Sequence, residues 1–194
     1  MGIVCGLDLA GPTNADSTVL SVFSERAGSL AFESVVCPAS DSAIIEELER
    51  LGRGRHVCLG IDAPLSYNET GGQRPCDADL VSALREAGLG FIGVMAPTYS
   101  KMGWLTLRGI TLTRAVLSIP RLVNVSVVEV HPGACMGLGG APEGALREYK
   151  KEDVASLERL KDWLAGQGVT GLPEGFGTCD DELDSAAAAL AAWE

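Results

Sequence analysis

The sequence is short of positive charge: 15 Lys and Arg residues stand against 26 Asp and Glu residues, a formal net charge of −11. This balance excludes a protein that coats nucleic acid by electrostatic attraction alone. Long apolar runs are also missing, so no segment could span a bilayer. No basic region precedes the first apolar segment, as it would in a signal peptide. We therefore expect a soluble, cytoplasmic protein without a membrane partner.

Paired cysteines are missing as well. The chain has six cysteines, and no two of them have C-x-x-C spacing. Reduced thiols in a cytosolic protein are favoured over a disulfide framework or a zinc site. A thiolate site that combines Cys76, Cys135 or Cys179 with His131 stays open as an alternative. Repeats and low-complexity tracts are absent, and 194 residues, 46% of them hydrophobic, suffice for a single domain over 1–194.

Acidic residues are absent from one long stretch, residues 87–128. The same stretch carries cations and aromatic rings, namely Lys101, Arg108, Arg114, Arg121, Phe91, Tyr99 and Trp104. Rings can stack on bases while cations hold phosphates, so this segment is a candidate surface for a polyanion. The alternative is a buried helical hairpin whose cations only increase solubility, and both interpretations stay open.

The apolar pattern predicts an α/β domain with a mixed five-stranded sheet and flanking helices. Strand-like runs at 3–9, 17–24 and 30–37 are joined by short connections, which predicts an antiparallel meander. A helix over 41–51, which Asp41 is expected to cap, then crosses to a fourth strand parallel to the first. The remaining expected elements are strands at 56–62 and 123–130 and helices at 77–87, 104–117, 152–167 and 181–193.

Two of these strands end in the same way, in Gly6-Leu7-Asp8 and Gly60-Ile61-Asp62. Both runs are apolar on both faces, which is typical of central strands, where an unpartnered carboxylate is costly to desolvate. Each glycine lies two residues before the aspartate on the same face, and we expect it to leave open space there. Parallel strands would place Asp8 and Asp62 at one edge of the sheet. Two carboxylates that face one space predict a divalent-metal site, although Asp62 could instead be a turn residue that binds backbone amides.

Two further groups could join such a site. Asp181 and Asp184 are three residues apart, so both lie on one face of a helical turn, although each could instead cap the last helix. Glu129 and His131 follow each other on one face at the end of the strand 123–130. Glu129 is a candidate ligand or base, and His131 is a candidate phosphate donor or proton shuttle or, equally, a hydrogen-bonded turn residue.

Arg74 offers a choice between an ion pair and a substrate contact. It could pair with Asp77 and order the loop that follows the fourth strand, or it could contact a phosphate. Lys101 lies in the stretch without acidic residues, and we count it with Arg74 as a candidate substrate-binding residue.

Three antiparallel strands, a helix, a parallel strand and then alternating elements follow the order of the RNase H-like fold. The chain resembles the family of RNase H-fold nucleases that is catalogued as a domain of unknown function, within the superfamily that includes resolvases. The resemblance rests on Gly6-Leu7-Asp8, Gly60-Ile61-Asp62-Ala63-Pro64-Leu65, Arg74-Pro75-Cys76-Asp77, Glu129-Val130-His131-Pro132 and Asp180-Asp181-Glu182-Leu183-Asp184-Ser185-Ala186.

The resemblance implies a metal-dependent nuclease. Its catalytic carboxylates and metal ligands would be Asp8, Asp62, Asp181 and Asp184, and Lys150 becomes a candidate substrate-binding lysine. Four such carboxylates would repel one another unless cations neutralise them. Two Mg²⁺ or Mn²⁺ ions roughly 4 Å apart would do so and hold a phosphodiester for in-line attack.

The acidic surface limits the expected partner to short or structured DNA or RNA. The oligomeric state is open, with a homodimer among the alternatives. Two other functions stay open: a non-catalytic module that binds nucleic acid or protein, and, ranked lower, a phosphotransferase like actin or sugar kinases. For the latter, Gly137–Gly140 is the one glycine-rich run that could serve as a phosphate loop.

Overall fold

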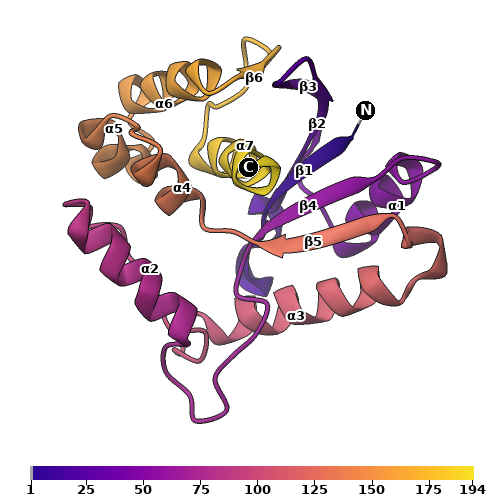
Figure 1. Ribbon diagram of the computed structural model, residues 1–194, viewed down its shortest axis with the longest axis horizontal. Helices are drawn as coiled ribbons and strands as arrows, with labels where there is room; N and C mark the ends of the chain where they lie inside the picture. Colours follow the sequence, from indigo (N-terminus) through magenta and orange to yellow (C-terminus); the bar gives the residue numbers. More distant parts are fainter. Residues whose placement is uncertain (1) are drawn as a thin grey trace.

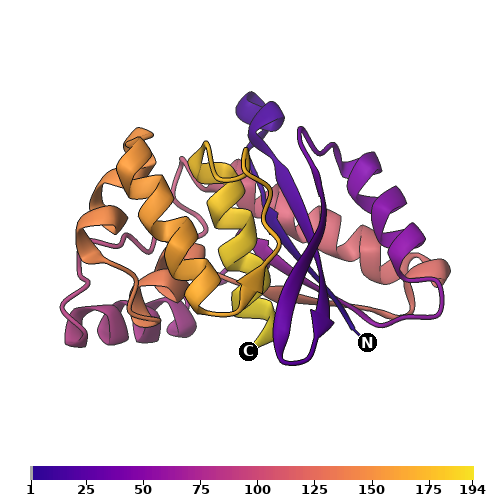
Figure 2. The same ribbon diagram turned by 90° about the horizontal axis from the view of Figure 1, so that it is seen from above.

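A mixed six-stranded sheet lies between two layers of helices (Figures 1 and 2). The computed structural model describes residues 2–194, apart from the side chain of Pro12. The strands are β1 (Ile3–Asp8), β2 (Val19–Arg26), β3 (Ser29–Val36), β4 (Val57–Asp62), β5 (Val125–Glu129) and β6 (Val169–Thr170). Their order in the sheet is β5-β4-β1-β2-β3-β6.

The strand pairing confirms most of the expected topology. β1, β2 and β3 form the antiparallel meander, and β4 pairs with β1 in parallel, as does β5 with β4. The prediction of five strands is wrong. The sixth strand, β6, pairs in parallel with β3 at the opposite edge through Val169 and Thr170. Two residues are too few to leave an alternating pattern in the sequence, so this strand carried no signal.

The described part of the chain contains seven α-helices and three short 3₁₀ helices. They are α1 (Asp41–Leu51), α2 (Pro75–Glu86), α3 (Gly103–Ser118), α4 (Pro132–Leu138), α5 (Glu143–Glu148), α6 (Val154–Gly166), α7 (Asp180–Trp193), η1 (Pro12–Ser17), η2 (Pro120–Leu122) and η3 (Tyr149–Lys151). The sequence had predicted neither α4 nor α5. None of these helices has both the length and the apolar character needed to cross a membrane.

Helix α1 spans the expected residues, but its N-cap is one residue earlier than expected. Ser40, and not Asp41, is the N-cap, and its side chain accepts a 3.1 Å hydrogen bond from the amide of Ala43. Asp41 occupies the first helical position, where its charge favours the positive end of the helix dipole. Its carboxylate also forms an ion pair of 2.7 Å with Arg108 of α3.

Different helices pack on the two faces of the sheet, and this determines the face on which the candidate site lies. Alternate residues of β1 point to opposite faces. Ile3, Cys5 and Leu7 pack with residues of α1 and α3, whereas Val4 belongs to a core shared with α5, α6 and α7. Asp8 is four residues after Val4 in the same strand, so its side chain points to the same face, the one that α7 covers. Figure 2 shows α7 against that face and α1 and α3 against the other.

Candidate functional site

Asp8 and Asp62 lie directly opposite each other in the parallel register of β1 and β4. Each is the last residue of its strand. The prediction that both aspartates meet at one edge of the sheet is therefore confirmed. Gly6 and Gly60 are paired in the same way, two residues earlier in each strand.

The expectation that these glycines leave open space is wrong. A methyl group on Gly6 would lie 1.9 Å from the carbonyl oxygen of Ser185 and 2.4 Å from the amide nitrogen of Ala189. One on Gly60 would lie 2.5 Å from the carbonyl oxygen of Ala188. The backbone of α7 fills this space, because two glycines on the sheet and small residues on the helix allow a very close approach. The glycines thus position a helix and do not leave a vacancy beside the carboxylates.

This close approach carries the acidic first turns of α7 to the strand ends. Asp184 is 1% exposed, and Asp181 is half-buried. The Tyr149 hydroxyl donates a 3.1 Å hydrogen bond to Oδ1 of Asp184, and the Lys150 ammonium forms an ion pair with Oδ2. Lys150 also pairs with Asp180 at 3.0 Å. The structure therefore gathers carboxylates from β1, β4 and α7 and places one ammonium group among them.

Burial and then the crowding of these carboxylates disfavour their ionised forms. Burial, followed by the charges of Asp184 and Asp62, raises the pKa of Asp8 well above its usual range. Burial and then Asp184 raise the pKa of Asp62 to about 7. The pKa of Asp184 is raised by burial although Lys150 opposes the shift, and that of Asp181 is raised by burial and then by Asp180. Such a cluster gains from any further positive charge brought to it.

Tyr149 and Asp180 take part in this cluster, and the sequence analysis had assigned a role to neither. A tyrosine before a lysine pair carries no local signal of a contact with a helix more than thirty residues away. Burial, followed by the charge of Asp184, raises the pKa of the Tyr149 hydroxyl, which keeps it protonated as a donor. Burial lowers the pKa of Lys150, but the charge of Asp184 outweighs it and the net shift is upward, so the amine stays charged.

Glu129 and Arg74 form a bidentate ion pair. Arg74 donates to Glu129 through Nη1 at 2.8 Å and Nη2 at 2.5 Å, and to Asp77 through Nη2 at 2.6 Å. The ion pair between Arg74 and Asp77 that the sequence suggested is present. Glu129 also accepts a 2.8 Å hydrogen bond from the amide of Leu65. These contacts tie β5 and the start of α2 to the loop that follows Asp62.

Both ring nitrogens of His131 have partners. Nδ1 accepts from the amide of Ala134 at 3.3 Å, which makes His131 the N-cap of α4, and Nε2 lies 3.1 Å from the carbonyl oxygen of Gly93. The carbonyl oxygen requires Nε2 to carry the hydrogen, which leaves Nδ1 as the acceptor. This arrangement matches the hydrogen-bonded turn residue, one of the two interpretations that the sequence allowed.

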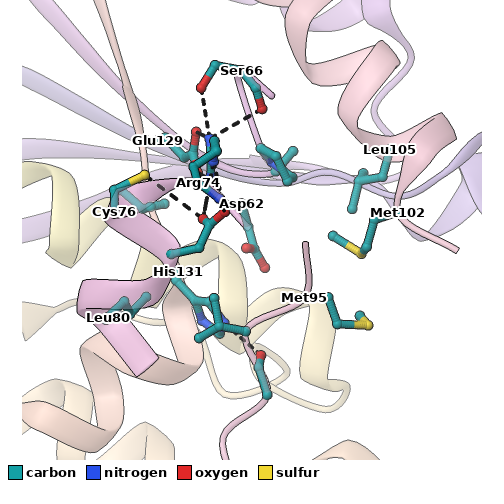
Figure 3. A pocket seen from close by; sticks show the side chains of 16 residues that line it. Asp62, Ser66, Arg74, Cys76, Leu80, Met95, Met102, Leu105, Glu129 and His131 are labelled. Atoms are coloured by element: carbon teal, nitrogen blue, oxygen red, sulfur yellow. Dashed lines mark hydrogen bonds and ion pairs between the residues drawn. The ribbon is translucent and has the colours of Figure 1, made fainter. Parts of the chain in front are cut away.

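Two cavities adjoin the carboxylate cluster. The larger, of about 570 Å³, is lined by Arg74, Glu129 and apolar side chains (Figure 3). The smaller, of about 210 Å³, is lined by Asp184, Lys150 and Tyr149. Asp62, Gly93 and His131 line both cavities. Asp62 therefore stands where the two spaces meet.

The basic and aromatic residues of 87–128 divide into two groups. Arg108 is tied to Asp41 and to the carbonyl oxygen of Ala10, and Arg121 pairs with Glu49. The second group is exposed and consists of Lys101, Arg114, Tyr99 and Trp104. Arg121 is exposed as well, despite its ion pair. Lys101 lies in the turn before α3. The segment is therefore neither a fully buried hairpin nor a continuous basic surface.

Cys76, Cys135 and Cys179, the three candidates for a thiolate site with His131, do not form such a site in the structure. Cys76 lines the larger cavity with His131, but both nitrogens of that ring have other partners. Burial raises the pKa of Cys135 to about 11 and also raises that of Cys179, which favours the protonated thiols. All six cysteines are free.

Among residues 2–194, no group of three or more His, Cys, Asp or Glu side chains already has the spacing of a metal site. The chemistry of the donors nevertheless fits a hard cation. Asp8, Asp62, Asp181 and Asp184 offer only oxygen, which is what Mg²⁺ and Mn²⁺ prefer. Burial, and for Asp8 and Asp62 also the charges of neighbouring carboxylates, raises the pKa values of Asp8, Asp62 and Asp184, and Lys150 supplies only one positive charge among them.

Fold and site together define an α/β protein with a carboxylate cluster at the ends of two neighbouring parallel strands. The family model described as "Protein of unknown function (DUF429)" matches residues 6–194, nearly the whole chain. The chain belongs to this family. Neither a curated protein nor a solved structure matches it.

Proposed function

We propose that the protein is a metal-dependent nuclease with an RNase H-like fold, which hydrolyses phosphodiester bonds of short or structured nucleic acid. The observation that carries the proposal is the pairing of Asp8 with Asp62 at the ends of β1 and β4, faced by Asp184 of α7. An antiparallel meander followed by parallel strands on the β1 side is consistent with this fold.

Asp8, Asp62 and Asp184, with Asp181 beside them, would hold Mg²⁺ or Mn²⁺. When bound, the cation would supply charge stabilisation to the phosphodiester and favour attack by water. The protein's own contribution is a fixed set of oxygen ligands. The backbone of α7, held against Gly6 and Gly60, sets the distance between Asp184 and the strand ends.

Lys150 is the residue best placed to contact a phosphate. Its side chain is 54% exposed although its ammonium reaches the buried carboxylate of Asp184. A cation bound between the aspartates would neutralise Asp184 and let the flexible lysine turn to a phosphate oxygen. Lys101 would add a weaker, exposed contact at the turn before α3.

Arg74 has a different role in this proposal from the substrate contact that the sequence suggested. Its guanidinium donates to Glu129, Asp77 and Ser66, so no nitrogen is left for a phosphate. Glu129 in turn binds the amide of Leu65. Arg74 and Glu129 are therefore positioning residues for the loop after Asp62.

The test is cleavage of a panel of RNA, DNA and hybrid substrates with Mn²⁺ or Mg²⁺. Asp8→Asn and Asp62→Asn should each reduce the rate by at least about 100-fold, because several kcal/mol of charge stabilisation are lost. Asp79→Asn, an exposed aspartate on α2, is the matched control and should keep full activity. Undiminished cleavage by Asp8→Asn would refute the proposal.

Calorimetry with Mn²⁺ separates the nuclease from a non-catalytic module. Heat of binding that disappears in Asp8→Asn supports the metal site, whereas its absence at millimolar Mn²⁺ favours a module that only binds. The phosphotransferase alternative is not favoured, because the glycine-rich run Gly137–Gly140, its candidate phosphate loop, forms the end of α4. There the amides of Gly139 and Gly140 bond to the carbonyl oxygens of Cys135 and Gly137.

A further inference from the structure

The larger cavity has two unlike walls. It opens beside Asp62 between α2, residues 93–95 and the start of α3 (Figure 3). Its volume of about 570 Å³ lies in the range of small-molecule sites, roughly 300–1,000 Å³. Ser66, Arg74 and Glu129 form a polar wall, and Figure 3 shows Met95, Met102 and Leu105 across the cavity from them.

Together with Asp77, which also lines the cavity, the polar wall carries a net negative charge despite its arginine. The single positive charge of Arg74 is shared between two carboxylates, Asp77 at 2.6 Å and Glu129 at 2.5 Å. Both Arg74 and Asp77 are buried, so these charges are poorly screened. A phosphate or carboxylate would be repelled here. A neutral group with N–H donors would be attracted.

The same wall presents one acceptor and one donor, both bound to Arg74. Oε1 of Glu129 accepts one hydrogen bond, from Nη2 of Arg74, and so retains a free lone-pair direction. Ser66 Oγ accepts from Nη1 of Arg74 at 3.0 Å, and within residues 2–194 no acceptor takes its own hydrogen. The two oxygens bind different nitrogens of the guanidinium, Ser66 Oγ at Nη1 and Glu129 Oε1 at Nη2. Glu129 can therefore accept from an amino group, and Ser66 can donate to an acceptor of the same ligand.

The opposite wall suits a flat, polarisable ring. Met95 and Met102 line this wall, and Met95 is 49% exposed. Thioethers form favourable contacts with aromatic rings and adapt to their outline. Leu80 of α2 and Leu105 of α3 add apolar contact. A planar group could lie between these side chains with its polar edge toward Glu129.

We propose that this cavity binds the unpaired base of a nucleotide, with preference for a base that carries an exocyclic amino group. The choice of a nucleotide rests on the proposed function, because Asp62 joins this cavity to the smaller one, where Lys150 and a cation held by Asp184 would meet the phosphate. A base in the cavity has left any duplex, so the substrate is single-stranded at that position.

The test measures binding of nucleosides without phosphate and without metal. The protein is labelled at its methionine methyl groups and titrated in EDTA with cytidine or uridine, which differ in the amino group. The signals of Met95 and Met102 should shift under the ring current, while that of Met136, fully buried in the core, should not. Cytidine should bind at least about 5-fold more tightly than uridine.

Two variants sharpen the result. Met102→Ala should weaken cytidine binding by roughly 3- to 10-fold, and Ser66→Ala should reduce the preference for cytidine over uridine. Leu107→Ala is the matched control, because Leu107 is 54% exposed on α3 and does not line the cavity. It should bind as the unchanged protein does.

Three results would overturn the proposal: no saturable shift of Met95 or Met102 at millimolar nucleoside, equal binding of uridine and cytidine, or tight binding of inorganic phosphate that displaces cytidine in EDTA. The titration does not depend on cleavage. If the protein binds cytidine but cuts no nucleic acid, the nuclease proposal is refuted and the base site is supported. If it cuts nucleic acid but binds no nucleoside, the base site is refuted and the nuclease proposal is supported.

Discussion

Gly6 and Gly60 are paired residues on β1 and β4, and the backbone of α7 passes directly over both of them. The paired aspartates Asp8 and Asp62 lie two residues further along the same strands. The depth at which α7 sits therefore determines where Asp184 meets these carboxylates. Close packing and the candidate site are two consequences of the same glycine pair.

Gly6→Ala should destabilise the protein by about 3 kcal/mol or more, at the upper end of the cost of overpacking. Its methyl group would lie 1.9 Å from the carbonyl oxygen of Ser185, and backbone atoms of a helix cannot yield locally. Urea unfolding measures the change. Gly11→Ala is the control, since a methyl group there meets nothing within 4 Å, and it should alter stability by no more than about 0.5 kcal/mol. Equal stability of the two variants would contradict the role of the close approach.

The sequence was sufficient to predict that the two aspartates meet at this edge of the sheet, but not how α7 packs beside them. Apolar runs with a shared ending predicted that Asp8 and Asp62 would meet, because strand pairing follows from the meander and one crossover. The meaning of the glycines was missed, because it depends on α7, more than a hundred residues later in the chain. The alanines of α7 are small enough for close packing on a sheet, and only the structure shows that this helix packs against these two glycines.

The contacts around Glu129 and Asp184 were less predictable for the same reason. Arg74 and Glu129 are separated by 55 residues, and Tyr149 and Asp184 by 35, so no periodicity links them. The ion pair between Arg74 and Asp77 was easier to predict, because Asp77 lies three residues after Arg74 at the start of a helix. Local pairs leave a pattern in the sequence, and contacts between distant elements do not.

The stability of the metal-free protein should fall as pH rises from about 4 to about 7. The pKa of Asp62 is raised from 3.8 to about 7 in the folded state, chiefly by burial and then by Asp184. Over that interval the unfolded chain loses a proton that the folded protein keeps, so ionisation favours unfolding. Thermal unfolding in EDTA at several pH values measures the slope.

Asp62→Asn should make that slope shallower and raise the melting temperature at pH 8 by a few degrees. About 1 kcal/mol shifts the midpoint of a domain of this size by roughly 2–4 °C. Asp79→Asn, on the exposed side of α2, should leave the slope unchanged. A steeper slope in Asp62→Asn would show that this carboxylate is not held protonated by its surroundings.

Arg74→Lys should destabilise the protein by on the order of 2–4 kcal/mol despite the conserved charge. A lysine cannot reproduce the planar fork that binds Glu129 and Asp77 together, so buried carboxylate oxygens would lose their donors. Chemical denaturation compares it with Arg26→Lys, whose exposed pair with Glu33 contributes little. Similar losses in the two variants would contradict a special role for the buried fork.

Lys150→Met should destabilise the metal-free protein by about 1–3 kcal/mol, because Asp184 is 1% exposed and would lose its ammonium partner. Lys151→Met is the matched control. Its exposed pair with Glu148 should contribute less than about 0.5 kcal/mol.

If a cation binds among the aspartates, Mn²⁺ should raise the melting temperature of Lys150→Met more than that of the unchanged protein, because it replaces the missing charge at Asp184. Thermal unfolding with and without Mn²⁺ measures this difference, and an equal response of both proteins would show that lysine and cation do not share the carboxylate.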